Sequence, residues 1–82
     1  SVKELNDLAK AGDVRSQITG TVNEIPVTEG AEVSAGQVLI VLEAMKMLTN
    51  VLSETSGKVS EIMVSLGDKV EVGDPLLIIT KS

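Results

Sequence analysis

Apolar and polar residues alternate through the middle of the chain and then give way to a continuous apolar run. The alternation around Val22 predicts a β-strand, and its slip of phase near Pro26 predicts a bulge or a bend. A turn at Gly30, a very short strand around Val33 and a second turn lead into the run Val38–Leu42. Because this run is continuously apolar, it predicts a strand that is buried on both faces.

The same pattern occurs twice, with an offset of 37 residues and no gap. The segments Gly20–Leu42 and Gly57–Ile79 share nine identical residues in 23 aligned positions, including all three glycines of each segment. Neither segment could bury its apolar face alone, so the repeat predicts two alike halves around one core, related by an approximate two-fold axis. We therefore predict an all-β fold, a small sandwich or a flattened barrel, with about four short strands in each half.

The first fifteen residues lie outside this repeat. Ser1 and Glu4 have the spacing of a helix-capping box, and apolar residues at helical spacing follow them. A short helix over Val2–Ala11 is one interpretation, and a linker remnant of a larger protein is the other. The predicted organisation is an N-terminal helix or linker over residues 1–15 and one β domain over residues 16–82.

The composition excludes several classes of function, because the chain has no Phe, Tyr, Trp, Cys or His. Zinc and iron–sulfur sites would lack their usual ligands, and a Ser–His or Cys–His nucleophile cannot form. The net charge of −5, without a basic patch or stacking aromatic residues, predicts no nucleic-acid partner. The longest apolar run, Val38–Leu42, is too short to span a membrane, and the polar start SVKELNDLAK is unlike a signal peptide. We therefore expect an acidic, soluble, cytoplasmic module with no direct membrane insertion.

The stretch LEAMKMLTN, Leu42–Asn50, joins the two halves. Leu48–Leu52 has the pattern of a strand leading into the second half, so the chain reversal is predicted at Met45 and Lys46, and Lys46 has no repeat partner. Tight hairpins prefer Asn-Gly or Asp-Gly because both central residues take positive φ, so Met-Lys would carry strain of about 1 kcal/mol or more. Strain of this kind persists where function requires the residues. A wider, unstrained turn or a solubilising edge lysine would explain Lys46 without a function.

The sequence E-A-M-K-M at Glu43–Met47 resembles the biotin attachment motif. Its flanks, with a G-x-V…V-x-x-G pattern in both halves, are similar to the biotinyl carrier domains of biotin-dependent carboxylases, decarboxylases and transcarboxylases over residues 17–81. The resemblance implies a flattened barrel of two four-stranded antiparallel sheets, a barrel-sandwich hybrid, with Lys46 on an exposed hairpin. It also implies that a biotin protein ligase attaches biotin covalently to Lys46. The implied flanking recognition residues are Glu43, Ala44, Met45 and Met47.

The role that the resemblance implies is presentation rather than catalysis, with no catalytic residue and no metal in the domain. The attached biotin would shuttle a carboxyl group between the active sites of a biotin carboxylase and a carboxyltransferase or decarboxylase, as separate subunits or linked domains. Two alternatives stay open. One is a lipoyl carrier domain of a 2-oxo-acid dehydrogenase complex, whose lysine usually lies in an E-[ST]-D-K-A context that this chain lacks. The other is an unmodified structural β-module.

The chain departs from the biotinyl family pattern at three places. Family members often carry A-P-M-x-G where this chain has Ser16–Gly20, and A-P-x-x-G where it has Ser53–Gly57. These differences concern the entry into the strands rather than the attachment site. Leu48 stands where an acidic residue often follows the second methionine, which makes the hairpin more apolar. The gap-free repeat also leaves no room for the "thumb" insertion of some bacterial acetyl-CoA carboxylase carriers.

Overall fold

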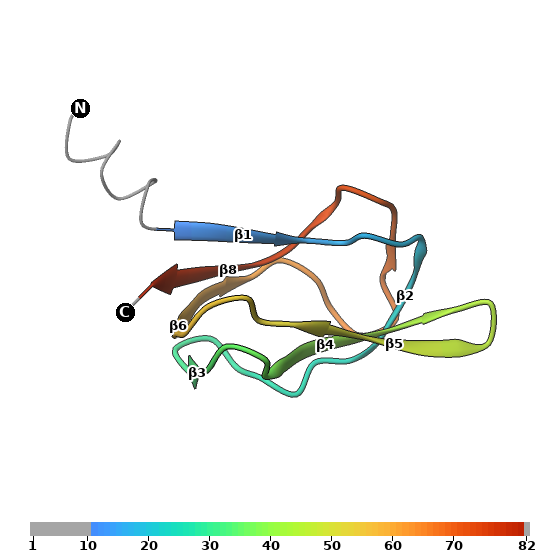
Figure 1. The fold of residues 1–82 in the computed structure, drawn as a ribbon. Helices are drawn as coiled ribbons and strands as arrows, with labels where there is room; N and C mark the ends of the chain where they lie inside the picture. The colour runs from blue at the N-terminus through green and yellow to red at the C-terminus, as the bar shows by residue number, and fades with distance from the viewer. Residues whose placement is uncertain (1–10, 82) are drawn as a thin grey trace, which may run out of the picture.

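Every regular element in the computed structural model, which describes residues 11–81, is a β-strand (Figure 1). The strands form two four-stranded antiparallel sheets, in the orders β1-β8-β6-β3 and β5-β4-β2-β7, so the predicted all-β barrel-sandwich class is confirmed. The strands are β1 (Ala11–Arg15), β2 (Gly20–Glu24), β3 (Glu32–Val33), β4 (Val38–Ala44), β5 (Met47–Leu52), β6 (Gly57–Ile62), β7 (Lys69–Val70) and β8 (Pro75–Lys81).

The sequence repeat is visible in the strands themselves. Strands β3 and β4 recur as β7 and β8 with bounds shifted by 37 residues, and β2 recurs as β6. Each sheet contains strands of both halves, so neither half forms a sheet by itself. The ladder shifts register at equivalent places, between Val22 and Glu24 in β2 and between Val59 and Glu61 in β6. The irregularity predicted near Pro26 therefore begins earlier, inside β2.

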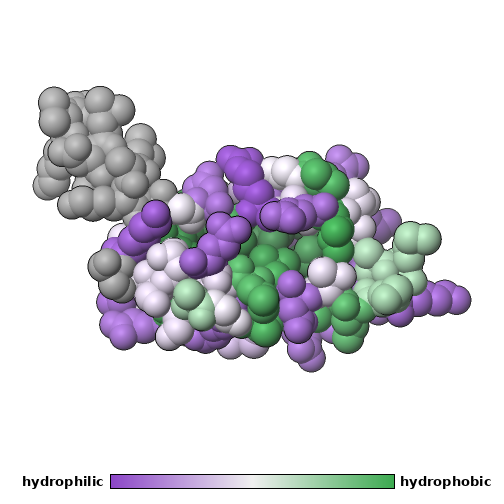
Figure 2. All heavy atoms as spheres, in the orientation of Figure 1, coloured by the Kyte–Doolittle hydropathy of each residue, from purple (hydrophilic) through white to green (hydrophobic). Residues whose placement is uncertain are grey.

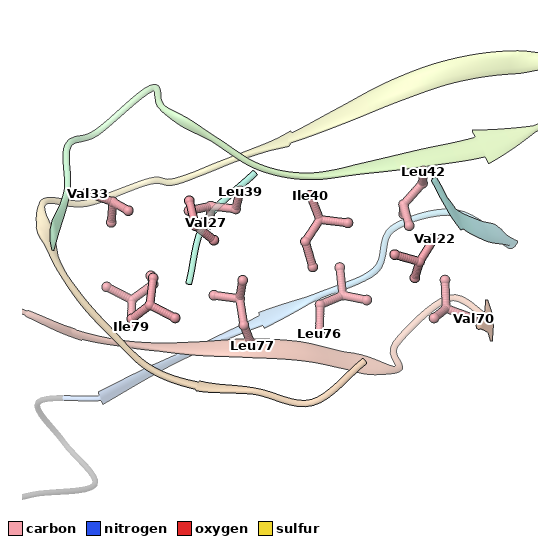
Figure 3. Packing of buried hydrophobic residues seen from close by; sticks show 11 residues of the cluster. Val22, Val27, Val33, Leu39, Ile40, Leu42, Val70, Leu76, Leu77 and Ile79 are labelled. Carbon is pink, nitrogen blue, oxygen red and sulfur yellow. The ribbon is translucent and has the colours of Figure 1, made fainter. Parts of the chain in front are cut away.

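The core is built from residues of both halves that face each other across the two sheets (Figure 3). Leu39, Ile40 and Leu42 point inward from β4, and their counterparts point inward from β8; Leu39 and Ile40 have no exposed surface. Full burial of such a side chain stabilises the fold by roughly 1.5–3 kcal/mol. Because the two halves contribute matching residues, the predicted shared core is confirmed. The β8 counterparts are Leu76, Leu77 and Ile79.

Strand β1 extends the β domain further toward the N-terminus than the predicted boundary at Ser16. Ala11–Arg15 pairs antiparallel with β8, and β1 is the repeat counterpart of β5. The helix predicted over Val2–Ala11 lies outside the described residues, apart from Ala11, which opens β1. Gly12 and Asp13 are poor strand formers, so the local sequence does not predict a strand here. The strand forms because the segment pairs with β8. The overlooked signal is the match of Val14 and Ser16 with Val51 and Ser53, at the same offset of 37 residues.

Ser16 and Ser53 stand where the alanine of the family's A-P pair often occurs, and they make the same hydrogen bond in both halves. Ser16 and Ser53 are buried, and their hydroxyls donate to the carbonyls of Ile18 and Thr55, each at 2.6 Å. Buried polar atoms are tolerated when they are hydrogen-bonded, and no buried side-chain polar atom in the described part of the chain lacks a partner. Both buried serine hydroxyls are therefore satisfied inside the fold.

Candidate functional site

The hairpin between β4 and β5 carries the candidate lysine at its tip (Figure 1). Ladder pairing continues to Ala44 opposite Met47, so Met45 and Lys46 form a two-residue loop. Their φ angles are 53° and 65°. Positive φ at both central residues is what a type I′ hairpin requires, because its twist matches that of the flanking strands. The predicted position of the reversal is confirmed, and the wider, unstrained turn is excluded.

The other turns of the molecule meet the same conformational demand with glycine. Four glycines, at φ between 86° and 93°, are the remaining residues with positive φ in the described range 11–81, and at each of them a Cβ would meet open space. At the tip, a non-glycine residue in this region costs about 1–2 kcal/mol. Met45 and Lys46 are therefore not the residues that the turn itself would favour. The glycines are Gly30, Gly36, Gly67 and Gly73.

The tip is open to solvent. Met45 is 95% exposed and Met47 is 71% exposed, and the side chains of Glu43 and Lys46 are also exposed. Ala44 is half-buried. No hydrogen bond or ion pair engages the Lys46 amine within residues 11–81. The five residues predicted for the site thus stand together on one hairpin, with the amine accessible to a large partner.

The base of the hairpin depends on a close approach at Gly20. Strand β2 pairs with β4 through Thr21 opposite Glu43, and Gly20 lies one step further toward the tip. A Cβ at Gly20 would come within 2.5 Å of the Glu43 carbonyl oxygen. Only glycine lets β2 lie this close to β4. Gly20 therefore allows β2 to support β4 as far as Glu43, and the hairpin beyond this point extends from the barrel. Its repeat counterpart Gly57 packs in the same way against the Thr80 carbonyl.

The surroundings of Lys46 do not form an enclosed reaction site. A groove of about 720 Å³ lies between β1 and β5, but none of its lining residues belongs to Glu43–Met47. No group of three or more potential metal ligands occurs in the described part of the chain, and the full sequence has no histidine to serve as a base. What the arrangement offers is a primary amine held away from the barrel, which an outside catalyst can reach and acylate.

The fold and the site together define a carrier domain: two matching β halves, with one exposed lysine on the turn that joins them. A family model described as "Biotin-requiring enzyme" matches residues 9–79. The chain therefore belongs to that family. It is a biotin carrier domain, and its cofactor is covalently attached biotin; the lipoyl alternative is not favoured.

Two curated relatives are similar over about half of the chain. The 1.3S subunit of methylmalonyl-CoA carboxyltransferase from Propionibacterium freudenreichii subsp. shermanii is 53% identical over 38 residues, which are 46% of this chain and 31% of that protein. A homologue of the biotinylated protein TB7.3 from Mycobacterium leprae is 48% identical over 42 residues, 51% of this chain and 59% of that protein. The matched regions thus span less than two thirds of either relative.

Two solved structures contain a similar domain within much longer chains. A single-chain, multi-domain long-chain acyl-CoA carboxylase aligns with a TM-score of 0.85 at 38% identity, over 89% of this chain and 7% of that chain. The urea carboxylase of Kluyveromyces lactis aligns with a TM-score of 0.80 at 38% identity, over 84% of this chain and 6% of that chain. In both, the similarity is confined to a small part of a large enzyme.

Proposed function

We propose that Lys46 is the residue to which biotin is attached, and that the hairpin presents this biotin to successive partner active sites. One observation carries the proposal: Lys46 occupies a strained, exposed position at the tip of a two-residue turn, where glycine would be the easier choice. The amine needs no rearrangement to be reached. The exposed tip fits the covalent cofactor of the family, because an amide bond requires only this free amine.

The attachment reaction is an acyl transfer to the Lys46 Nζ. To accept biotin, the Lys46 Nζ would lose two protons to bases of the ligase and form a C–N bond to the activated acyl carbon, whose C–O bond to the leaving AMP would break. When bound, biotin supplies the group that carries the carboxyl. Met45 and Met47 supply an exposed, adaptable apolar surface beside the amine, and Glu43 and the half-buried Ala44 complete the recognition sequence.

The partners that we propose are a biotin protein ligase, a biotin carboxylase, and a carboxyltransferase or decarboxylase. The support is that one relative is a subunit of a carboxyltransferase and that two solved neighbours are carboxylases. In this proposal the domain is non-catalytic and gains its effect by holding biotin at high local concentration near each active site. No helix within residues 11–81 is long and apolar enough to cross a membrane. Cytoplasmic location stays a prediction.

Biotinylation with a bacterial biotin protein ligase, biotin and ATP tests the proposal, with intact mass as the readout. We expect the wild type to gain one biotinyl group and Lys46→Arg to gain none. Lys58→Arg, which changes an exposed lysine on β6, is the matched control and should be labelled like the wild type. Labelling that survives in Lys46→Arg would refute the assignment. A lipoyl adduct, formed with a lipoate ligase in place of any biotinyl adduct, would refute the biotin carrier.

A further inference from the structure

Strand β5, Met47–Leu52, lies at the edge of its sheet and pairs with β4 on one side only. Just after the strand, the Ser53 N–H points to this same side, because it donates to the Gln37 carbonyl at 2.8 Å. Backbone groups of successive residues in an antiparallel strand point alternately to its two sides. The N–H and C=O groups of every second residue of β5 therefore point away from β4. These residues are Leu48, Asn50 and Leu52.

The edge of β5 carries none of the usual protection against pairing with another chain. Edge strands commonly avoid such pairing through charged side chains or proline. All six residues of β5 are uncharged, none is proline, and all but Val51 are exposed. Of the seven large apolar residues that are exposed within residues 11–81, three belong to this strand. The three are Met47, Leu48 and Leu52.

The internal repeat supplies a control for this edge, because β1 is the equivalent edge strand of the other sheet. Asp13 and Arg15 of β1 stand at the positions equivalent to Asn50 and Leu52 of β5. The two β1 side chains form an ion pair at 3.1 Å. The same backbone therefore has a charged edge in one half and an uncharged, apolar edge in the other. The fold itself does not require the apolar edge.

A groove separates the two edge strands and leaves β5 open to another molecule. Its volume is about 720 Å³, and β1 and β5 both line it. Most of its lining residues occur as repeat pairs, such as Val14 with Val51 and Leu42 with Ile79, so the groove lies close to the approximate two-fold axis. Green apolar surface is visible in the middle of this face (Figure 2). No strand within residues 11–81 pairs with both β1 and β5.

We propose that β5 pairs antiparallel with β5 of a second copy of this chain and joins the two sheets into one. A two-fold dimer brings the same strand of both copies together, and residues with outward backbone groups must face each other. The register centred on Asn50 places Leu48 opposite Leu52 of the second copy, and Thr49 opposite Val51 of the second copy. Apolar and β-branched side chains then form the cross-strand pairs that stabilise sheets. A register centred on Thr49 would instead place Leu48 opposite Asn50.

The residue on the dimer axis explains why β5 pairs with itself and β1 does not. Two Asn50 side chains meet at the axis, and a carboxamide both donates and accepts hydrogen bonds. The equivalent pairing of β1 would place Asp13 opposite Asp13 of the second copy. Like charges directly opposite each other destabilise a sheet. The charge pattern therefore favours a second copy on β5 and disfavours one on β1.

The dimer is expected to be weak. Five paired residues span about 17 Å, so strand pairing alone covers less than the roughly 800 Å² that each partner buries in a standard interface. We expect a dissociation constant on the order of 100 µM. The two β5 strands run in opposite directions, so the two hairpin tips point to opposite ends of the dimer. The proposal does not depend on Lys46 being the attachment site.

Two asparagines provide matched variants for the test. Asn50→Asp places two carboxylates opposite each other on the dimer axis. An aspartate already stands at the equivalent position 13, so this backbone accommodates the residue. Asn23→Asp makes the same chemical change at an exposed position on β2, which lies inside the sheet between β4 and β7. Both variants have the same net charge and are expected to fold, which thermal unfolding checks.

The first measurement is analytical ultracentrifugation of the purified protein from about 10 µM to about 1 mM. We expect the wild type and Asn23→Asp to dimerise with similar dissociation constants. Asn50→Asp should dimerise at least about tenfold more weakly, because it brings two like charges together. A wild type that stays monomeric over this range would overturn the proposal. Equal dissociation constants for the two variants would overturn it as well.

The second measurement uses a single cysteine to test the register, since the chain has no cysteine of its own. Asn50→Cys would place two Cα atoms about 5.5 Å apart across the axis, which suits a disulfide. Asp13→Cys is the matched control on β1. With diamide as the oxidant, the Asn50→Cys dimer should form at least about tenfold faster than the Asp13→Cys dimer. Equal rates would overturn the pairing through β5. Biotinylation of Lys46 is measured separately, and its failure would refute the proposed function without affecting the dimer.

Discussion

The turns inside each half and the turn between the halves all require residues with positive φ, but they use different residue types. Inside the halves, Gly36 and Gly73 take φ of 90° and 93° at equivalent positions. Between the halves, Met45 and Lys46 take φ of 53° and 65° without being glycine. Glycine is the residue that this backbone conformation favours, so the internal turns follow conformational preference. The central turn departs from that preference at the one place where a lysine can be offered to a partner.

The largest effect should come from the core, where the two halves are equivalent. Leu39 and Leu76 are repeat partners, and both have no exposed surface. Leu39→Ala and Leu76→Ala should each lower the free energy of unfolding by about 2–5 kcal/mol, because each removes the same buried volume. Urea unfolding followed by circular dichroism measures both. A difference of more than about 2 kcal/mol between them would show that the halves do not share the core equally.

The next largest change in the free energy of unfolding is expected at a glycine turn, and a much smaller one at the Met45-Lys46 turn. Gly73→Ala should lower the free energy of unfolding by about 1–2 kcal/mol, since alanine must adopt a left-handed conformation there. Lys46→Ala should change it by less than about 0.5 kcal/mol, because one non-glycine residue replaces another at an exposed position. The same urea experiment compares the two variants. An equal loss in both would mean that Lys46 itself stabilises the turn.

Replacing the tip by a preferred turn sequence should stabilise the protein, whereas the substitutions above destabilise it or leave its stability unchanged. The double variant Met45→Asn with Lys46→Gly should raise the free energy of unfolding by about 1 kcal/mol, because Asn-Gly suits a type I′ turn. It should also abolish biotinylation. Unfolding curves and intact mass after ligase treatment measure the two results. If the double variant were no more stable than the wild type, the tip would not be strained.

The smallest change in the free energy of unfolding is expected for an ion pair on the edge strand β1. On β1 an ion pair joins Arg15 and Asp13 at 3.1 Å, and both side chains are about half exposed. Because exposed pairs are screened by water and salt, Asp13→Asn should lower the free energy of unfolding by less than about 0.5 kcal/mol. Repeating the urea curves at low and high salt tests this expectation. A salt-dependent loss larger than about 1 kcal/mol would show that the pair holds β1 on the sheet.

The sequence predicts most of this fold because the repeat supplies each assignment twice. Val33 and Val70 each stand alone between two turns. The very short strands β3 and β7 that contain them are nevertheless predicted correctly, because the two segments match in the repeat. Strand β1 was missed since Gly12 and Asp13 have low strand propensity, and only pairing with β8 decides their conformation. The register shifts inside β2 and β6 depend on pairing with neighbouring strands, so the phase slip near Pro26 locates them only approximately.

The candidate site is predictable to a different degree. The tip position of Lys46 follows from the repeat, since the segment between two gap-free halves must reverse the chain. The closeness of Gly20 to Glu43 does not follow, because it depends on sheet order. Leu48, which had no explanation in the sequence, lies opposite Glu43 in the β4–β5 ladder and is exposed.

The most direct test of the central claim is to locate the modification after ligase treatment. Peptide mapping by tandem mass spectrometry distinguishes Lys46 from the other five lysines of the chain. The account predicts that biotin is found on Lys46 alone, in the peptide that contains E-A-M-K-M. Biotin on any other lysine at comparable occupancy, or a fully active ligase that leaves Lys46 unmodified, would contradict it.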